Sequence, residues 1–242
     1  MLRAALDPLL SLVFPRECQI CHGLVESFDL GVACRQCWSE TRIFDGTEAL
    51  CLKCGAFRGD IEPFPTAACH NCTDHQYHSA KAAGIYEKAL AATVLRLKED
   101  PVITNAGKNA FLAGFDRTDL DPATIAMPVP LSRQRRIERG FNQAEVLCRL
   151  LKPFRDIRID THSLIRRRHT PMHRAAMDRK ARADSVRNAF EVTRPNFVKD
   201  REILLVDDVF TSGATASSCA EALKKAGASK VSVLTLARAV SI

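Results

Sequence analysis

Four Cys-x-x-Cys pairs in the first third of the chain constrain its fold more than any other feature. They hold eight of the ten cysteines: Cys18/Cys21, Cys34/Cys37, Cys51/Cys54 and Cys69/Cys72. Two thiolates on one tight turn can bind one cation, and two pairs complete the tetrahedral four-sulfur shell that Zn²⁺ prefers. We therefore expect two adjacent zinc ribbons, one from the first two pairs and one from the last two.

Three other sites could use the same cysteines: a disulfide framework, a redox dithiol and an iron–sulfur cluster. Four evenly set pairs are more than a redox motif needs, and so many thiols in a reducing compartment favour metal ligation. A module of about 60 residues with few apolar side chains needs a metal to fold, so both zinc ions are expected to be structural. Cys148 and Cys219 lie in helical patterns and are expected to be buried thiols.

Histidine and aromatic side chains accompany the cysteine module. Four cysteines already saturate each site, so the histidines are expected to be exposed rather than ligands: His22, His70, His75 and His78. The aromatic residues could stack on bases, although packing of the module is the simpler expectation. They are Trp38, Phe44, Phe57 and Tyr77.

The apolar N-terminus, residues 1–15, raises the question of a signal peptide or membrane anchor. Asp7 and Pro8 interrupt it, and it is shorter than the roughly 18 to 20 apolar residues that a span needs. We expect a short docked helix, no membrane span and a cytoplasmic protein. Residues 1–77 are expected to form this helix and the double zinc ribbon.

From residue 78 to residue 242, short apolar runs alternate with helical stretches, which predicts an α/β domain with an open, mainly parallel sheet. The expected strands are 80–86, 124–129, 203–206 and 231–236, and the expected helices are 88–98, 105–115, 143–151 and 216–226. Such a sheet binds ligands at the carboxyl ends of its strands, so the segments after Val129 and Val206 are the candidate sites.

The segment after Val206 has the composition of a phosphate cradle. Two acids come first, followed by small and hydroxyl-bearing residues that open a helix: Asp207, Asp208, Thr211, Ser212, Gly213, Ala214 and Thr215. The amides at a helix N-terminus carry partial positive charge toward an anion. The acids are expected to reach ribose hydroxyls, with Mg²⁺ close by. Neither a Walker loop nor a G-x-G-x-x-G fingerprint is present in the sequence.

Positive charge gathers in one region. The stretch from Arg133 to Arg182 holds fifteen Lys or Arg against five Asp or Glu, whereas the whole chain carries a net charge of +7. A solvated basic face is one reading, and a polyanion site is the favoured one. Within it, the guanidinium forks of Arg133, Arg135, Arg136 and Arg139 suit pyrophosphate or a DNA backbone. Asn142 and Gln143 are expected as polar anchors, with a helix cap as the alternative for Asn142.

Together these motifs resemble one known family. The motifs are PVPLSR at 128–133, RRxxRGFNQAE at 135–145, DDVFTSGAT at 207–215 and the N-terminal Cys pairs, and the combination resembles the ComF/ComFC (GntX-like) family. The resemblance covers nearly the whole chain. It implies a type I phosphoribosyltransferase-like domain that binds phosphoribosyl pyrophosphate (PRPP) with Mg²⁺. It also implies a role in uptake or use of single-stranded DNA during natural competence, with a possible protein partner in the DNA-uptake machinery.

The basic stretch 165–190 occupies the place of a mobile loop in that family, and its length and charge suit a lid over the substrate. Thr170-Pro171 and Ala189-Phe190 agree with the family pattern, whereas His173, Ser185 and Asn188 depart from it. Around Lys98 the chain reads LKEDP where the family tends to place Gly-Asp, so the resemblance assigns no role to Lys98.

Two functions fit these observations. The first is an enzyme in which a nitrogen nucleophile attacks C1 of PRPP and expels pyrophosphate, with most of the acceleration from positioning and electrostatics. The sequence identifies no general base: Glu138, Glu145 and His169 are possible in principle, but each is expected to be a surface residue. The second is a nucleic-acid-binding accessory whose cradle senses PRPP or a 5′-phosphate without turnover. The acceptor base is not indicated by the sequence.

Overall fold

The structure is a computed structural model of the chain. It describes residues 11, 13–56, 69, 72–118, 120, 124–155, 157–167 and 188–240. Most of the predicted N-terminal helix, Phe57, His70 and residues 168–187 of the lid predicted over 165–190, including His169, lie outside this set. No helix in the described ranges is both long enough and apolar enough to span a membrane.

The central sheet has five parallel strands in the order β1-β7-β6-β2-β3. They are β1 (Ser79–Ile85), β2 (Ile125–Pro128), β3 (Arg158–Ile159), β6 (Glu202–Phe210) and β7 (Lys230–Arg238). Strand β6 lies in the middle, where Val206 is opposite Pro128 of β2 and Leu234 of β7. Because the strands are parallel, their carboxyl ends meet at one edge, and the segments after β2 and β6 meet there too.

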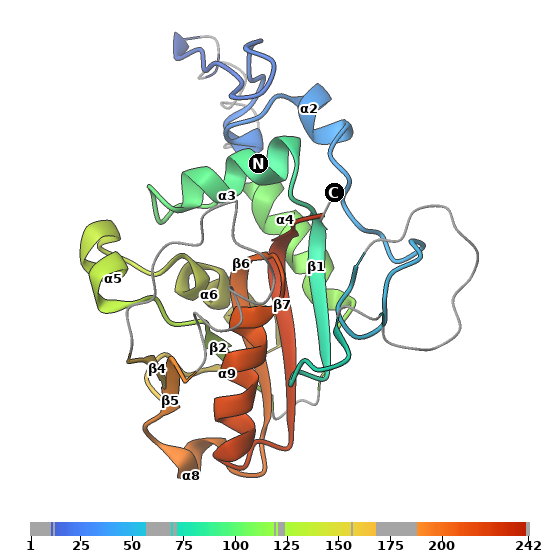
Figure 1. Cartoon of the computed structure of the whole chain (residues 1–242). Helices are drawn as coiled ribbons and strands as arrows, with labels where there is room; N and C mark the ends of the chain where they lie inside the picture. The colour runs from blue at the N-terminus through green and yellow to red at the C-terminus, as the bar shows by residue number, and fades with distance from the viewer. Residues whose placement is uncertain are drawn as a thin grey trace.

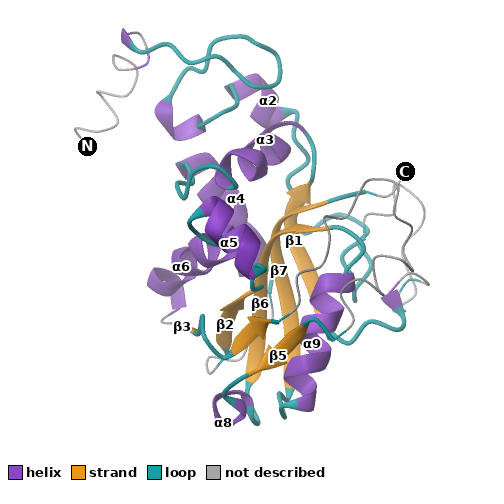
Figure 2. Ribbon diagram, turned by 60° about the vertical axis from the view of Figure 1, so that its left-hand side comes forward, coloured by secondary structure: helices purple, strands orange, loops and turns teal. Residues whose placement is uncertain are grey.

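Helices cover both faces of the sheet (Figures 1 and 2). On one face are α3 (Lys88–Leu97), α4 (Asn105–Asp116) and α6 (Gln143–Arg155), and on the other is α9 (Ala214–Lys225). Strand β6 serves both layers: Leu204 and Val206 pack in the apolar cluster of the three helices, whereas Ile203 and Leu205 pack in the cluster of α9. A strand that is buried on both faces needs this unbroken aliphatic run.

The remaining elements are short. A 3₁₀ turn, η1 (Phe28–Leu30), and α2 (Arg35–Ser39) belong to the first cysteine group, and α5 (Arg133–Arg139) follows β2. Strands β4 (Leu164–Arg166) and β5 (Phe190–Val192) form a separate antiparallel pair, followed by α8 (Pro195–Val198). The stretch predicted as a lid therefore starts on β4 and ends on β5.

The N-terminal part of the chain extends the edge of the sheet. Ile43 lies opposite Gly84 of β1 in an antiparallel bridge. The Phe44 amide donates to the Ala83 carbonyl at 2.8 Å, and the Ile85 amide donates to the Arg42 carbonyl at 2.9 Å. The division of the chain into 1–77 and 78–242 stays a prediction.

The expected α/β class with a mainly parallel sheet and an N-terminal cysteine module is confirmed, and the structure corrects some bounds. The strand predicted over 203–206 continues to Phe210, so Asp207 and Asp208 lie in β6 and not in a loop after it. The segment after Val129 contains helix α5. The helix predicted over 143–151 runs on to Arg155, past Pro153.

Candidate phosphate site and metal centres

The predicted phosphate cradle, residues 207–215, lies at the junction of β6 and α9. Gly213 has φ +79°, and a Cβ there would lie 2.7 Å from the Phe210 ring and 2.8 Å from the His75 ring, so this position needs glycine. Helix α9 begins at Ala214 without a side-chain cap on Gly213. Thr211 is exposed, and Ser212, Ala214 and Thr215 are half-buried. The start of α9 thus presents its amides beside a row of small and hydroxyl-bearing residues.

Asp208 is held by side chains from two other parts of the chain. Its Oδ2 lies 3.5 Å from Lys98 Nζ, just after α3, and accepts a hydrogen bond of 3.4 Å from Gln143 Nε2 of α6. Gln143 in turn accepts from the Arg139 guanidinium at 2.9 Å. Asp208 and Gln143 are both buried. The carboxylate at the end of β6 is therefore fixed from the α3 and α6 side of the sheet.

Asp207 has different surroundings. Successive side chains of a strand point to opposite faces, which turns Asp207 toward the α9 face. Burial and the neighbouring Asp208 charge raise the pKa of Asp207 well above its ordinary value. Its charge acts on Arg166 at the end of β4, on Cys219 of α9 and, from the other layer, on Cys148 of α6. The expectation that both acids reach ribose hydroxyls together stays a prediction.

Helix α5 carries the arginines of the RRxxRGFNQAE motif. Ser132 caps its start by accepting from the Arg135 amide at 3.4 Å, and Gly140 ends it in the left-handed conformation with φ +76°. None of its residues is buried. Arg136 lies 3.7 Å from Glu145 of α6. The helix therefore presents an exposed basic surface beside the start of α6.

The five residues predicted for pyrophosphate or DNA phosphate fall into three groups. Arg139 and Gln143 are linked to Asp208. Asn142 is buried and structural, because it caps α6 by accepting from the Ala144 amide at 3.0 Å and donates to the Val129 carbonyl at 3.1 Å. Arg133 and Arg136 are exposed on α5. A phosphate role for these five residues stays a prediction.

The first four cysteines meet as predicted. Cys18, Cys21, Cys34 and Cys37 have their Sγ atoms within 4.8 Å of one another. Two of the separations are 3.7 Å for Cys18–Cys37 and 3.6 Å for Cys21–Cys34. Zn–S bonds of about 2.3 Å in a tetrahedron place sulfurs about 3.8 Å apart, and a disulfide requires about 2.05 Å. This group could hold zinc and is not disulfide-bonded.

The second group consists of Cys51, Cys54, Cys69 and Cys72. Its Sγ atoms also lie within 4.8 Å of one another, and it is more deeply buried than the first group. The Cys51–Cys72 and Cys54–Cys69 separations are 3.7 and 3.5 Å. Although burial raises the pKa of Cys51, backbone amides including those of Cys54 and Cys69 lower it to about 6, whereas burial raises the pKa of Cys54 and of Cys72. This group could hold a second zinc ion.

The two groups differ in what they pack against. The first forms a small apolar cluster of its own with Val25, Ala33 and Ala89 of α3. The second lies in the main core on the α9 side of the sheet, together with Tyr77, Phe210 and residues of β7 and α9. The Arg238 guanidinium, at the end of β7, donates to the Cys54 carbonyl and lies 3.6 Å from its Sγ. The second group is thus part of the domain that carries the cradle.

Sequence reasoning missed His75 and Lys98 in the site. His75, three residues after Cys72, places its Nδ1 2.5 Å from the Tyr77 hydroxyl and packs its ring beside Gly213. It was expected to be exposed and is half-buried. The Cys-x-x-His spacing of Cys72 and His75 is visible in the sequence, but it indicates a possible metal ligand and not a contact with Gly213. Lys98 carried no signal, since its partner Asp208 lies 110 residues further along the chain.

Two solved structures are similar to part of the chain. One is titled as the structure of the allosteric regulatory enzyme of purine biosynthesis, with 20% identity and a TM-score of 0.35 over 63% of this chain and 26% of that chain. Another is a purine phosphoribosyltransferase from Pyrococcus horikoshii, with 15% identity and a TM-score of 0.28 over 62% and 78%. Both superpositions are too loose to transfer a site.

Sequence relatives are more informative. Competence protein ComFC of Bacillus subtilis is 33% identical over 156 residues, which are 63% of this chain and 61% of that protein. Competence protein F of Haemophilus influenzae is 36% identical over 114 residues, 47% and 49% of the two chains. DNA utilization protein YhgH of Escherichia coli K12 is 34% identical over 110 residues, 46% and 47%.

The chain thus spans about half to three fifths of the length of these curated relatives. No protein-family model matches it. The relatives carry competence and DNA-utilization names, and the described part of this chain has the parallel sheet and the two four-cysteine groups that the motifs predict. The chain is a homologue of the ComF/ComFC competence proteins.

Proposed function

We propose that the chain binds PRPP, or another compound with a ribose 5-phosphate, at the junction of β6 and α9, and acts in the handling of single-stranded DNA. The observation that carries this proposal is the Asp208 carboxylate, held by Lys98 and Gln143 near the end of the strand that leads into the start of α9. A phosphate suits the helix amides, and a carboxylate suits ribose hydroxyls.

The charged and polar groups along this edge of the sheet could accommodate the three parts of PRPP, one after another. The 5′-phosphate would lie against the amides of Gly213, Ala214 and Thr215, where the helix dipole is favourable. The ribose would lie toward Asp208. The pyrophosphate would then lie toward Lys98 and Arg139, whose cations reach Asp208 directly or through Gln143.

Mg²⁺ is compatible with this donor set, because it prefers oxygen ligands and usually binds one or two carboxylates together with substrate phosphates. Asp208 offers such an oxygen at the strand end. When bound, Mg²⁺ would supply positive charge that screens the diphosphate. In pentosyl transfer the nucleophile would form a bond to C1 while the bond from C1 to the pyrophosphate oxygen breaks, and pyrophosphate would leave with the electron pair.

Calorimetric titration with PRPP in the presence of Mg²⁺ tests the proposal. Asp208→Asn should lower PRPP affinity by more than about tenfold, because it removes the charge that attracts the cation and accepts from ribose. Asp160→Asn, at the end of edge strand β3, is the control and should bind PRPP like the parent chain. Equal PRPP affinity in the Asp208→Asn variant and the parent would refute a PRPP site at this edge.

A second role, as a nucleic-acid-binding accessory, is favoured by α5. This helix has no buried residue, carries Arg133, Arg135, Arg136 and Arg139, and exposes 72% of Ile137. Guanidinium groups on an exposed helix suit a phosphodiester backbone. The competence and DNA-utilization names of the relatives agree with such a ligand.

Charge reversal on α5 tests this second role. The double substitution Arg133→Glu and Arg136→Glu should weaken oligo(dT) binding and reduce the slope of log affinity against log salt by about 0.7 for each phosphate that the variant no longer binds. Exchanging Lys152 and Arg149 of α6 for Glu gives a control with the same change in net charge. If both double variants lose the same affinity, α5 is not the interface.

A further inference from the structure

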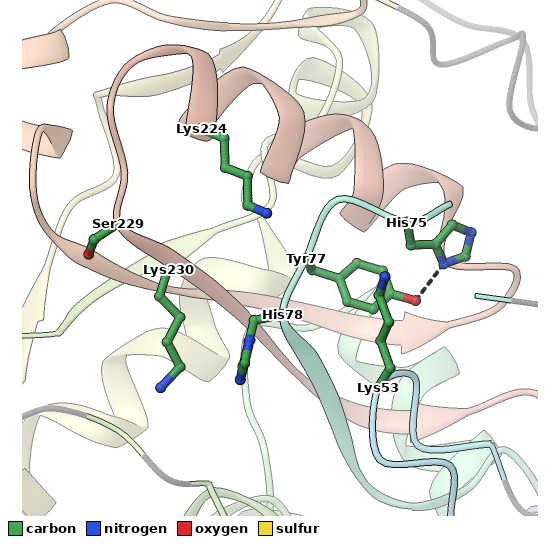
Figure 3. A pocket seen from close by; sticks show the side chains of 7 residues that line it. All are labelled: Lys53, His75, Tyr77, His78, Lys224, Ser229 and Lys230. Atoms are coloured by element: carbon green, nitrogen blue, oxygen red, sulfur yellow. Dashed lines mark hydrogen bonds between the residues drawn. The ribbon is translucent and has the colours of Figure 1, made fainter. Parts of the chain in front are cut away.

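A second basic site lies along the side of α9, away from Asp208. Its pocket has a volume of about 350 Å³ and is lined by Lys53, His75, Tyr77, His78, Lys224, Ser229 and Lys230. These residues come from the second cysteine group, from the chain leading into β1, from the last turn of α9 and from the start of β7. Figure 3 shows Lys53 and Lys224 reaching in from opposite sides of Tyr77.

The pocket runs from the amino edge of the sheet toward the cradle. Lys230 and Ser229 lie where β7 begins, at the end opposite the phosphate cradle. Lys224 is in the last turn of α9, ten residues and therefore about 15 Å along the helix from Ala214. His75 stands at the far end, with its ring beside Gly213. The pocket is therefore distinct from the candidate PRPP site and borders it through His75 and Tyr77, whose ring contacts Phe210.

The charges that line this pocket are of one sign. Three ammonium groups and two imidazoles line it, and no carboxylate is among the lining residues that the structure describes. Lys230 has Glu202 at 3.5 Å, and Lys53 donates to the Thr73 carbonyl at 3.0 Å. The Thr73 carbonyl has no net charge and so does not neutralise Lys53. The Glu202 carboxylate offsets the charge of Lys230, one of the three lysines.

Helix electrostatics explain only part of this arrangement. A lysine in the last turn of a helix stabilises the negative end of the helix dipole, and α9 has two, Lys224 and Lys225. Lys225 pairs with Glu221 at 2.7 Å on the outer surface, whereas Lys224 lines the pocket opposite Lys53. Folding alone gives no reason to bring Lys53 and Lys230 to the same pocket, since like charges repel.

We infer that this lysine pocket binds a phosphate group. Ammonium ions are point-charge partners for phosphate oxygens, and the hydroxyl of Ser229 adds a hydrogen-bond donor. The phosphate can belong to a nucleic acid backbone or to a free phosphate compound. This inference is independent of the PRPP proposal, because none of the residues proposed to contact PRPP lines the pocket.

The test compares two neighbouring lysines of one helix. In the test variant Lys53→Gln and Lys224→Gln remove two pocket charges, and in the control Lys53 is kept while Lys225→Gln and Lys108→Gln remove two charges elsewhere. Both are prepared in the Asp208→Asn background, so that binding at the cradle does not contribute. The probes are fluorescent oligo(dT) of about 20 nucleotides, followed by anisotropy, and inorganic pyrophosphate, followed by calorimetry.

The test variant is expected to lose about tenfold in affinity for at least one probe, while the control keeps the affinity of its background. Loss for oligo(dT), with a salt slope reduced by about 1.4 for two phosphates, identifies a backbone phosphate. Loss for pyrophosphate alone identifies a free phosphate compound. Unchanged binding of both probes, or equal losses in test and control, would overturn the inference. Circular dichroism establishes that each variant is folded.

Discussion

At the residue scale, the two adjacent acids of β6 have different environments. Asp208 lies with Lys98 and Gln143 on one face of the sheet, and Asp207 is turned toward α9 and carries a strongly raised pKa. Burial and the neighbouring carboxylate both disfavour the charged form of Asp207. The folded chain without a ligand therefore loses stability when this carboxyl ionises, as is common for ionisable groups at binding sites.

Replacing Asp207 should therefore stabilise the unliganded protein. An acid whose folded pKa is raised costs stability above that pKa, and the cost disappears as pH falls below the unfolded value. Asp207→Asn should raise the free energy of unfolding by about 1 kcal/mol or more at pH 7, with a gain that shrinks toward pH 4. Denaturant unfolding at several pH values measures it.

The pKa of Asp160, which follows β3, is shifted in the opposite direction to that of Asp207. Although burial raises its pKa, hydrogen bonds from Ser163 and from the His162 and Ser163 amides, together with Arg194, lower it overall. Its contribution to stability is present above the unfolded pKa and is lost as pH falls. Asp160→Asn should therefore destabilise at pH 7, by about 1 kcal/mol or more, and less at low pH. If the two variants have the same pH dependence, this account of Asp207 is wrong.

The sequence could predict the acids but not their partners. The run of aliphatic residues followed by Asp207 and Asp208 is a local pattern that predicts a buried strand with two acids toward its carboxyl end. Lys98 meets Asp208 only because α3 and β6 belong to the same layer, a fact of tertiary structure. The bond from Gln143 to Asp208 has the same origin, whereas the cap that Asn142 makes is local and could be foreseen.

At the element scale, the second cysteine group covers part of one face of the sheet, as a helix does elsewhere in the domain. Beside α9 it covers the outer strands of the sheet, where Tyr77 and the four cysteines pack with Ala80, Val231 and Val233. The first group contacts the domain through α3 and α4. A metal at the second group therefore supports the sheet and the cradle, and a metal at the first supports a peripheral module.

Disabling the two groups one at a time should separate these roles. Cys72→Ser should destabilise the whole domain by more than about 3 kcal/mol and increase amide exchange in β6 and α9. Cys21→Ser, at an exposed position of the first group, should leave exchange in the sheet unchanged. Hydrogen exchange followed by mass spectrometry makes the comparison. Equal protection of β6 in both variants would show that the second group does not support it.

Elements were predicted well where their periodicity is local. The bounds expected for β1, α3, α4 and β7 agree with the structure to within about two residues. Strand β6 was predicted too short because Asp is unfavourable in strands, yet pairing with β7 continues to Phe210. Strands β4 and β5 have three residues each and pair across the basic stretch, so neither has a pattern long enough to recognise.

At the scale of the whole molecule, the cysteine pairs divide as their spacing predicts. The first two pairs form one group and the last two form the other, and the two Cys148 and Cys219 thiols outside them are buried, which raises the pKa of both. Spacing suffices here because each group closes over a short segment. The packing of the second group against α9 and β7 could not be predicted, since it depends on residues far along the chain.

Metal analysis of the purified protein should return two zinc ions per chain. Their removal by a chelator should lower the unfolding temperature of the full chain, and added zinc should restore it, because binding to the folded state stabilises it. Elemental analysis and calorimetry provide the measurements. Iron in place of zinc, or an unfolding temperature that a chelator does not change, would contradict two structural zinc sites.

The contact between Arg238 and Cys54 joins residues 184 positions apart. During synthesis the second cysteine group leaves the ribosome long before β7 exists, so its thiolates can capture a metal while their packing partners are still missing. The core on that side of the sheet closes only when the last strand arrives. We therefore expect metal binding to precede formation of the cradle, so that a shortage of metal would impair folding before any ligand could bind.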